Sequence, residues 1–316
     1  MASLTPPAAA NRAQRLAHFA ATAAAIGTFG CASPQRAQTT TAASLPAATA
    51  TSADVLAQSA PSDWRRLDPM RTLLMDVNGG QVVIELAPVF APLHVANLVT
   101  LAKAGYFDGL AIVRVQDNYV VQWGDPDGKR PLGAITHSLP QEYEVDASAL
   151  PFTPLPDGDV YAAEVGWSAG FPVGRDPKRG KAWMAHCYGV VGVGRDMPPD
   201  TGLGNELYAV SGHAPRHLDR NLAMVGRVVA GMPLLTALPR GTGPLGFYER
   251  AEQRVTITRV RMASDAPAAE QPGIELLRTD TKTWSAYVAS RRFRNEGFFV
   301  APTGKVELCN VAVPTR

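Results

Sequence analysis

Residues Val113 to Gly128 read V-R-V-Q-D-N-Y-V-V-Q-W-G-D-P-D-G. They contain two short runs rich in β-branched residues, Val113 to Val115 and Tyr119 to Val121, separated by a polar turn and followed by a cluster of Gly, Pro and Asp. This pattern predicts two strands and a corner. An arginine between valines is ordinarily an outward charge on a sheet. Residues two apart on a strand share a face, however, so Arg114 can also lie near Gln122 and the ring of Tyr119 on one surface.

The composition favours a globular, β-rich protein without nucleic-acid partners. Of the 316 residues, 46% are hydrophobic and only 18% are charged, which is enough apolar material to build a core. The formal net charge of +2 is spread along the chain, so no basic stripe is present to bind a phosphate backbone. The high counts of proline, 26, and glycine, 28, favour a loop-rich fold with many corners.

Further strands are expected on both sides of the central stretch. Asn78-Gly79 lies between two apolar-rich runs, and Asn-Gly is the strongest short-range signal for a tight hairpin. The expected strands outside the central stretch cover residues 72–77, 81–86, 182–186, 190–193, 207–210, 223–229 and 255–262.

Two helices are expected among these strands. The first begins at Pro92, carries apolar residues at helical spacing as far as Ala102 and ends before Gly105. We expect it to cap one mouth of a barrel. The second is short and covers residues 233–238. His94 on the first helix is interpreted as a surface residue, because no second His or acidic residue stands at metal-ligand spacing from it.

From Lys129 to Gly180 the sequence is rich in proline, which central strands exclude, so we expect mostly loop here and an insertion at about residues 144–180. Gly166 to Gly170 match the G-x-S-x-G pattern of a hydrolase nucleophile elbow. That motif requires a helix directly after the serine. The following Phe171 to Pro177 cannot form one, so a hydrolase is disfavoured.

The residues after Met262 form a C-terminal extension, 263–316. We expect an amphipathic helix from about Lys282 to Arg294 and a strand from Lys305 to Val311 in it. Three arginines near the end of that helix form either a docking surface or a solvated helix face. They are Arg291, Arg292 and Arg294.

With these elements in place, the chain resembles the cyclophilin-type peptidyl-prolyl cis-trans isomerases. The resemblance rests on a strand arginine, an aromatic residue five positions later and a Gln-x-Gly-Asp motif, which here are Arg114, Tyr119 and Gln122 to Asp125. It covers about Thr72 to Met262. Further segments follow in family order, namely Gly80 to Leu86, Ala91 to Asn97, Gly105 to Gly109, Leu218-Asp219 and Val225 to Met232.

The resemblance implies a mainly β fold, a closed antiparallel barrel of eight strands capped by two helices, and an enzyme that accelerates rotation about Xaa-Pro bonds. The barrier to this rotation is about 18–20 kcal/mol, because the amide must leave its plane. No acid, base, metal or cofactor is required. The catalyst needs an apolar slot for the proline ring and a donor that binds the twisted amide better than either planar form.

The resemblance also implies the site residues. Arg114 is the expected donor, since its guanidinium stays charged and presents a fixed fork of N–H groups. Tyr119 and Gln122 complete the expected catalytic set, with Gln122 holding a carbonyl of the substrate backbone. The expected substrate-binding residues are Val120, Gly194, Arg195, Glu206, Tyr208, Leu218 and Leu222.

The rim of this site departs from the family pattern. Glu206 and Tyr208 stand where the family usually has Gln and Phe, and Leu222 stands where it often has His. Gly194-Arg195 replaces a common Ala-Asn pair. Two functions therefore stay open. One is an isomerase of exported proteins, and the other is a catalytically weak or inactive cyclophilin-like scaffold that binds peptides in the periplasm.

Residues 1–37 are predicted to be an export signal. Arg12 and Arg15 precede an apolar run from Leu16 to Phe29, which is too short to span a bilayer and is typical of a secretory leader. Cys31 follows Gly30, as at a bacterial lipoprotein cleavage site. The leader therefore ends either in lipidation of Cys31 or in cleavage nearby.

Residues 38–70 are expected to be a flexible linker, with an isomerase domain at 71–262. Export implies a periplasmic location, with lipid anchoring to the membrane if Cys31 is modified. The expected partners are proline-containing segments of exported client proteins, and membrane contact is expected only through the anchor. In an oxidising compartment Cys187 and Cys309 are either paired or both buried thiols.

Overall fold

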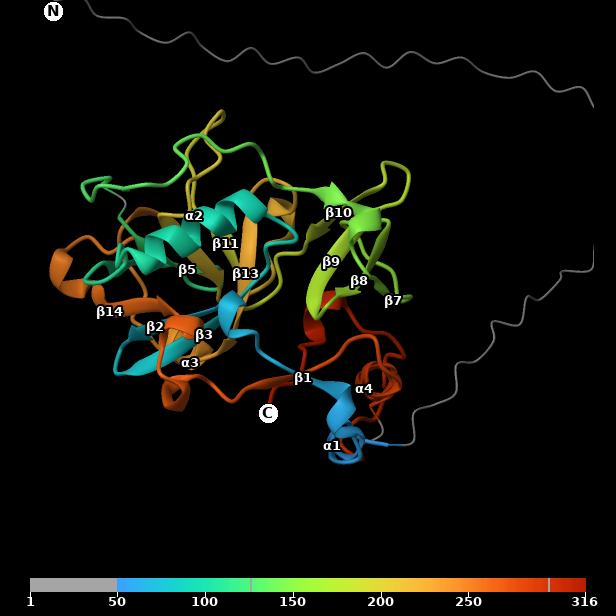
Figure 1. Cartoon of the computed structure of the whole chain (residues 1–316). Helices are drawn as coiled ribbons and strands as arrows, with labels where there is room; N and C mark the ends of the chain where they lie inside the picture. The colour runs from blue at the N-terminus through green and yellow to red at the C-terminus, as the bar shows by residue number, and fades with distance from the viewer. Residues whose placement is uncertain (1–49, 126, 295) are drawn as a thin grey trace, which may run out of the picture. The chain divides into compact units, whose positions relative to one another are not determined.

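The computed structural model describes residues 50–125, 127–294 and 296–316 (Figure 1). The predicted leader, the proposed modification of Cys31 and the first part of the expected linker lie outside the described residues.

The centre of the fold is a closed antiparallel barrel of eight strands, as predicted. Its strands follow one another in the order β11-β12-β5-β4-β14-β2-β3-β13, and β13 pairs with β11 to close the ring. The strands are β2 (Thr72–Val77), β3 (Gly80–Leu86), β4 (Ala111–Val115), β5 (Val120–Gly124), β11 (Val190–Val193), β12 (Glu206–Val210), β13 (Met224–Ala230) and β14 (Val255–Met262).

The hairpin between β2 and β3 is confirmed. Asn78 and Gly79 both have positive φ angles, 52° and 73°, which is the backbone that a tight two-residue hairpin requires. The two strands then pair from Thr72↔Glu85 to Val77↔Gly80. This register sends Leu73, Met75 and Val77 into the barrel core.

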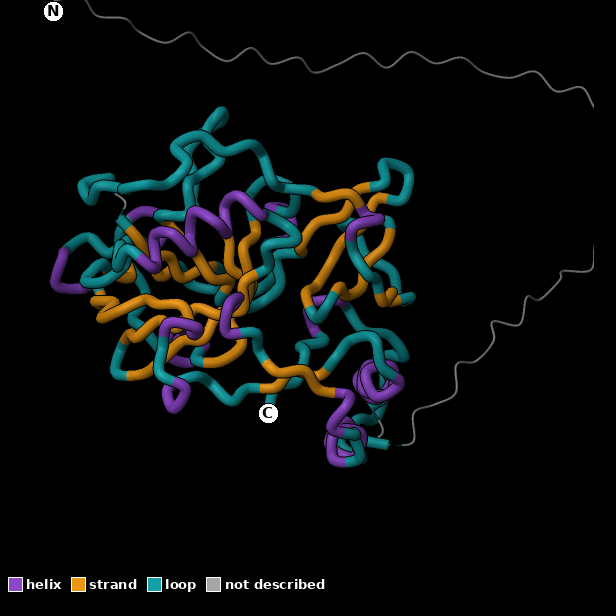
Figure 2. The backbone as a smooth tube through the Cα atoms, viewed as in Figure 1, coloured by secondary structure: helices purple, strands orange, loops and turns teal. Residues whose placement is uncertain are grey.

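Two helices pack against the barrel, α2 (Pro92–Lys103) and α3 (Met232–Thr236) (Figure 2). Val95, Leu98 and Leu101 of α2 and Leu235 of α3 belong to the same apolar core as the inward side chains of the strands. Pro92 begins α2, where its missing N–H leaves no helical hydrogen bond unmade.

The interpretation of His94 as a surface residue is wrong. Its side chain is 0% exposed, and its Nδ1 lies 2.6 Å from a carboxylate oxygen of Glu142. The same carboxylate accepts from the backbone N–H groups of Leu93 and His94, which satisfies the free donors at the start of α2. His94 is a buried part of the helix N-terminus.

Residues 129–180 are mostly loop and turn, as expected, but the proline-rich insertion within them also carries strands. It forms a separate antiparallel sheet in the order β6-β10-β9-β8-β7. Pro154 lies on β7, an edge strand, where its missing N–H removes no bond from the interior of the sheet. Ser168 ends β8 and is followed by a turn into β9, so no nucleophile elbow is present. The strands are β6 (Val145–Asp146), β7 (Thr153–Leu155), β8 (Glu164–Ser168), β9 (Phe171–Asp176) and β10 (Lys181–Met184).

The segment before the barrel contains a helix and a strand, so the expectation of a flexible linker is wrong for residues 50–70. Helix α1 (Ser52–Ala57) lies beside α4 (Lys282–Phe293), and the hydroxyls of Ser52 and Ser290 are 2.8 Å apart (Figure 1). Strand β1 (Trp64–Arg66) pairs with β15 (Glu275–Leu277). The residues preceding the barrel and the C-terminal extension therefore fold together.

The helix expected in the extension is confirmed as α4, whereas residues 305–311 hold a short 3₁₀ turn instead of the expected strand. Arg292 of α4 is not on a solvated face. It is buried and forms an ion pair of 2.5 Å with Asp157 of the insertion. The 3₁₀ turns are Pro61–Asp63, Pro69–Arg71, Ala147–Ala149, Arg216–Leu218, Pro244–Gly246, Ala251–Gln253, Ala263–Asp265, Ala268–Glu270 and Leu308–Asn310.

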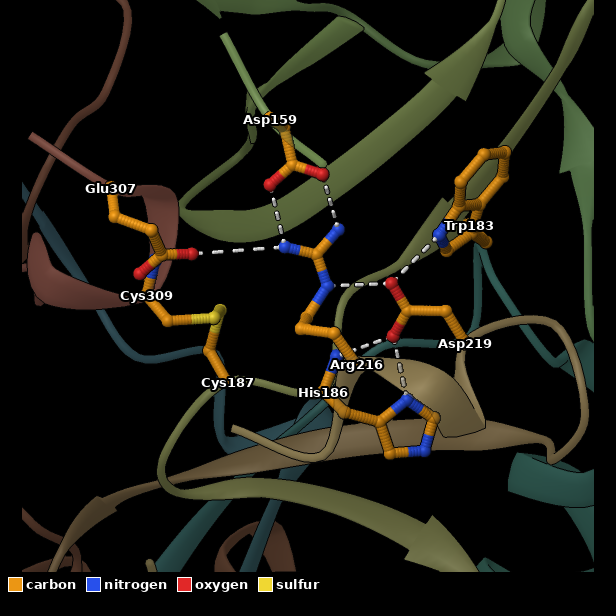
Figure 3. Close-up of a disulfide and its surroundings, with 8 residues drawn as sticks. All are labelled: Asp159, Trp183, His186, Cys187, Arg216, Asp219, Glu307 and Cys309. Carbon is orange, nitrogen blue, oxygen red and sulfur yellow. Dashed lines mark hydrogen bonds and ion pairs between the residues drawn. A yellow bond between two sulfur atoms is a disulfide. The ribbon is translucent and has the colours of Figure 1, made fainter. Parts of the chain in front are cut away.

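The insertion and the extension share a second apolar core. The rings of Trp167 and Trp284 pack edge to face with centroids 4.8 Å apart. Cys187 and Cys309 form a disulfide with Cα atoms 4.9 Å apart, which confirms the paired alternative (Figure 3). This bond joins the segment before β11 to the extension.

Candidate functional site

All ten residues that the sequence assigned to the site line one cavity of about 690 Å³. Strands β4, β5 and β12 carry part of the set, and the turn between β4 and β5, the loop after β11 and the segment before β13 carry the rest. The ten are Arg114, Tyr119, Val120, Gln122, Gly194, Arg195, Glu206, Tyr208, Leu218 and Leu222.

Strand pairing places the central members in one row. Arg114 is opposite Gln122 in the β4–β5 pair, and Gln122 is opposite Tyr208 in the β5–β12 pair. Tyr208 is in turn opposite Gly192 of β11. Side chains directly opposite one another on neighbouring strands share a face of the sheet, so the register alone brings these residues together. At Gly192 a Cβ atom would lie 2.3 Å from the Tyr208 hydroxyl, so this position requires glycine.

The guanidinium of Arg114 is held from several sides. Nε donates to the carbonyl of Leu245 at 2.7 Å, Nη1 donates to Oε1 of Gln122 at 3.2 Å, and Nη2 donates to the side chain of Gln116. The rings of Tyr119 and Phe247 lie 5.5 Å and 5.3 Å from the guanidinium carbon. Burial lowers the pKa of Arg114 from its ordinary value. Arginine nevertheless stays charged in proteins, because its ordinary pKa is far above neutral.

Gln122 lies between Arg114 and Glu206. Its Oε1 accepts from Arg114, and its Nε2 donates to Oε2 of Glu206 at 2.9 Å. These two partners define the orientation of the amide. Burial raises the pKa of Glu206, and the neighbouring carboxylates of Asp196, Asp125 and Asp200 raise it further against the opposing hydrogen bond from Gln122.

Apolar side chains form a slot beside these polar groups. Val120 and Tyr208 are 3% and 6% exposed, and they form a small apolar cluster together with Tyr119 and Leu222. Leu218 lines the same cavity. The cavity therefore places apolar side chains beside the guanidinium of Arg114.

The guanidinium of Arg195 is held by backbone carbonyl groups at the edge of the cavity. Its Nε and Nη2 donate to the carbonyl of Asn221 at 3.0 and 2.9 Å, and its Nη1 donates to the carbonyl of Asp196. Gly194 beside it donates its backbone N–H to the carbonyl of Glu206 at 2.9 Å. These contacts join the loop after β11 to β12 and to the segment before β13.

The sequence did not point to the segment around Phe247. This segment runs along β4, where Gly241 donates to the carbonyl of Val115 and Tyr248 donates to the carbonyl of Val113. It thereby brings the Leu245 carbonyl and the Phe247 ring onto Arg114. No local signal marks these residues, because their role arises from a contact across more than a hundred residues. The other lining residues that were missed are Asp196, Asp200, Gly202, Leu203 and Asn205.

One part of the cavity is rich in carboxylates. Asp196, Asp200 and Glu206 all line it, and none of them forms an ion pair within the described part of the chain. Among these same residues, no group of three or more His, Cys, Asp or Glu side chains is arranged to hold a metal ion. Nor is any helix in residues 50–125, 127–294 or 296–316 both long and apolar enough to cross a bilayer.

Residues 72–262 match the family model for the cyclophilin type peptidyl-prolyl cis-trans isomerases, and the chain belongs to this family. The crystal structure of cyclophilin AquaCyp293 from Hirschia baltica is similar to this chain with a TM-score of 0.64 and 25% sequence identity. That similarity covers 84% of this chain and 97% of the other, so it extends beyond the part that the family model matches.

The curated relatives match shorter segments. A stretch of 54 residues, 17% of this chain, is 44% identical to peptidyl-prolyl cis-trans isomerase-like 2 of Gibberella zeae. A stretch of 78 residues, 25% of this chain, is 38% identical to a protein of Staphylococcus saprophyticus whose name assigns it provisionally to the peptidyl-prolyl cis-trans isomerases. The matched parts span only 9% and 40% of the length of these two proteins.

Proposed function

We propose that this protein accelerates the cis–trans isomerisation of Xaa-Pro bonds in exported proteins. Membership of the cyclophilin family supports this activity. The observation that carries the proposal is the position of the Arg114 guanidinium, which lies at the edge of an apolar slot and is fixed in orientation by neighbouring carbonyl groups.

The proposed mechanism is preferential binding of the twisted amide. As the Xaa-Pro bond rotates, the prolyl nitrogen regains a lone pair that a guanidinium N–H can bind. Arg114 has five N–H donors, and the described residues engage one on each of its three nitrogens. The second N–H of each terminal nitrogen is then available to the substrate. Because planar amides offer this donor no such lone pair, the interaction lowers the barrier.

The remaining site residues would hold the substrate. Gln122 uses one N–H of its amide for Glu206, and the second can donate to a substrate carbonyl. Tyr119, Val120 and Tyr208 would contact the proline ring, with Leu218 and Leu222 closing the slot. A fixed Gln122 places the peptide while Arg114 acts on the rotating bond.

We also propose that the protein acts in the periplasm on proline-containing segments of exported clients. The basic and apolar leader favours export. The disulfide between Cys187 and Cys309 supports an oxidising compartment, since such bonds are rare where thiols are kept reduced. Anchoring by a lipid on Cys31 remains one of the two ways in which the leader can end.

A second candidate is a peptide-binding scaffold of low or no catalytic power. The altered rim favours it, because Glu206 and Leu222 replace residues that the family commonly uses. Three of the donors of Arg114 are also already engaged by Leu245, Gln122 and Gln116.

Turnover of an Xaa-Pro tetrapeptide by the full-length mature protein separates the two candidates. Binding of the same peptide is measured in parallel by titration. The isomerase proposal expects both binding and turnover above the uncatalysed rate. Binding without turnover would establish the scaffold, and the absence of both would reject the site.

A further inference from the structure

The hydroxyl of Tyr208 points away from the slot into the protein. It lies 3.0 Å from Nε2 of His186 and 3.6 Å from the sulfur of Met224. Burial raises the pKa of this phenol well above its ordinary value, so it stays protonated. The ring of Tyr208 therefore forms a wall of the cavity, while its polar end is held from behind by His186.

His186 is itself held by a carboxylate. Its Nδ1 lies 2.9 Å from Oδ1 of Asp219, and its backbone N–H donates to the same oxygen at 3.0 Å (Figure 3). A carboxylate can only accept, so Nδ1 of His186 carries a proton, and in that tautomer Nε2 accepts the Tyr208 O–H. The side chain of His186 is 0% exposed, so water does not compete for these bonds.

Asp219 is anchored in turn. Its Oδ2 accepts from Nε of Arg216 at 2.6 Å and from Nε1 of Trp183 at 3.1 Å (Figure 3). Burial alone would raise the pKa of Asp219, but the hydrogen bond from His186 and the charge of Arg216 outweigh it and lower the pKa. Asp219 is therefore a buried carboxylate whose charge is satisfied on both oxygens.

Arg216 connects this series of hydrogen bonds to the parts of the protein outside the family domain. Its terminal nitrogens donate to Asp159 of the insertion at 3.0 and 3.3 Å, and Nη1 lies 3.8 Å from Glu307 of the extension. The next residue after His186 is Cys187, whose disulfide reaches Cys309 (Figure 3). The insertion and the extension thus meet directly behind the slot.

We propose that His186, Asp219 and Arg216 are positioning residues that hold Tyr208 in the wall of the proline slot. The inference rests on the proposed function, because it takes the slot to be the place where the proline ring binds. Leu218, another member of the slot, directly precedes Asp219, so the same anchor also places a second wall residue.

The space around the Tyr208 hydroxyl is restricted. Gly192 lies directly against it, and any side chain there would occupy the same space. A phenol with no partner would leave a buried polar group unpaired, which costs stability. The hydrogen bond to His186 therefore selects one orientation of the Tyr208 ring.

The expected effect falls on binding of the proline ring and not on the rotation step. The slot contacts the ring in the planar and the twisted states alike, so loosening it weakens both equally. KM and the peptide Kd should rise, while kcat should stay close to that of the wild type. Loss of the Arg114 donor has the opposite signature, since it lowers kcat.

The test uses the full-length protein with two variants, Tyr208→Phe and Asp219→Asn. Tyr208→Phe removes only the hydroxyl and is expected to fold, since the ring is kept. Asp157→Asn is the matched control, because Asp157 is also a buried carboxylate paired with an arginine but does not line the slot. Peptide Kd is measured by titration, kcat and KM by turnover, and unfolding by denaturant for every variant.

We expect Tyr208→Phe and Asp219→Asn each to raise Kd and KM by about threefold to tenfold, the range for one lost hydrogen bond. The double variant should raise Kd and KM no more than the more affected single variant does, because both changes interrupt the same series of hydrogen bonds. The control should lose stability without a change in Kd. Unchanged Kd in Tyr208→Phe, a similar rise in the control, or additive effects in the double variant would overturn the proposal. Since Kd is measured without turnover, these outcomes stand apart from failure of the proposed isomerase activity.

Discussion

The amide of Gln122 donates to the carboxylate of Glu206 at 2.9 Å, and the same amide accepts from Arg114. The carboxylate therefore determines which end of the amide faces the guanidinium. A glutamine at position 206 could accept in the same way, but it would carry no charge. The difference between the two residues should appear in substrate preference and in pH dependence.

Arg114→Ala is expected to lower kcat/KM by about 10²–10³, on the order of 3–4 kcal/mol, as for the loss of one preorganised donor. The peptide Kd should change much less, because the donor acts on the twisted amide. Arg114→Lys should not restore the rate, since an ammonium on a flexible stem lacks the planar fork. Arg259→Ala is the control, because Arg259 pairs with Asp76 outside the cavity. Normal turnover by a folded Arg114→Ala protein would disprove the mechanism.

Peptides with a lysine next to the Xaa-Pro bond should be turned over about two to five times faster than peptides with a glutamate there, the range for a partly exposed charge pair. The reason is the group of three carboxylates at Asp196, Asp200 and Glu206. Glu206→Gln should reduce this preference. The ratio of kcat/KM for the two peptides is the measurement, at low and high salt.

The same ratio should depend on pH. The pKa of Glu206 is raised above its ordinary value of 4.5, so this carboxylate takes up a proton earlier than usual as the pH falls. The preference for lysine should be complete above the raised pKa and decline as the pH drops through it. Glu206→Gln should lack this decline, whereas Glu252→Gln, an exposed change outside the cavity, should keep it. A Glu206→Gln protein with an unaltered pH profile would contradict the role given to this charge.

Removing the disulfide should destabilise the protein. Replacing both Cys187 and Cys309 by serine is expected to lower the free energy of unfolding by about 2–4 kcal/mol, because the unfolded chain is no longer cross-linked. The measurement is denaturant unfolding with and without a thiol reductant. The reductant should lower the free energy of unfolding of the wild type and leave that of the double-serine protein unchanged. An unchanged free energy of unfolding in the reduced wild type would argue against the disulfide.

The mature protein is expected to lack the leader, and its intact mass identifies the new first residue. A start at Cys31 with added lipid would support the anchor. A start elsewhere, with no lipid, would leave export standing and remove the anchor. Retention of residues 1–37 in protein isolated from the cell envelope would refute the predicted signal.

The strands of the barrel could be predicted because their signals are local, whereas the closed barrel itself was implied by the resemblance to the cyclophilins. Asn78-Gly79 specifies its own hairpin, and the β-branched runs around Arg114 alternate at the period of a strand. Arg114, Gln122 and Tyr208 lie in one row of the cavity because strand register places them opposite one another, while other site residues reach the same cavity from loops. Their part in catalysis stays a prediction.

The remaining structure depends on contacts between distant residues. Helix α1 is only six residues long and is stabilised by packing on α4. The residues that make this contact are far apart in sequence, since Ser52 and Ser290 are 238 positions apart. The proline content of the insertion concealed a sheet, in which Pro154 lies on the edge strand β7 and Pro172 lies on the interior strand β9. His94 was interpreted as exposed because its partner Glu142 stands 48 residues away, and neither residue signals the pair.

The disulfide also has a consequence for biosynthesis. Cys187 and Cys309 are 122 residues apart, and the chain is made from its N-terminus. While strands β11 to β14 and the pairing strand β15 are still being synthesised, the native partner of Cys187 is not yet present. The disulfide behind the slot can therefore form only after the extension has been synthesised. A non-native disulfide of Cys187 formed before then would prevent this bond.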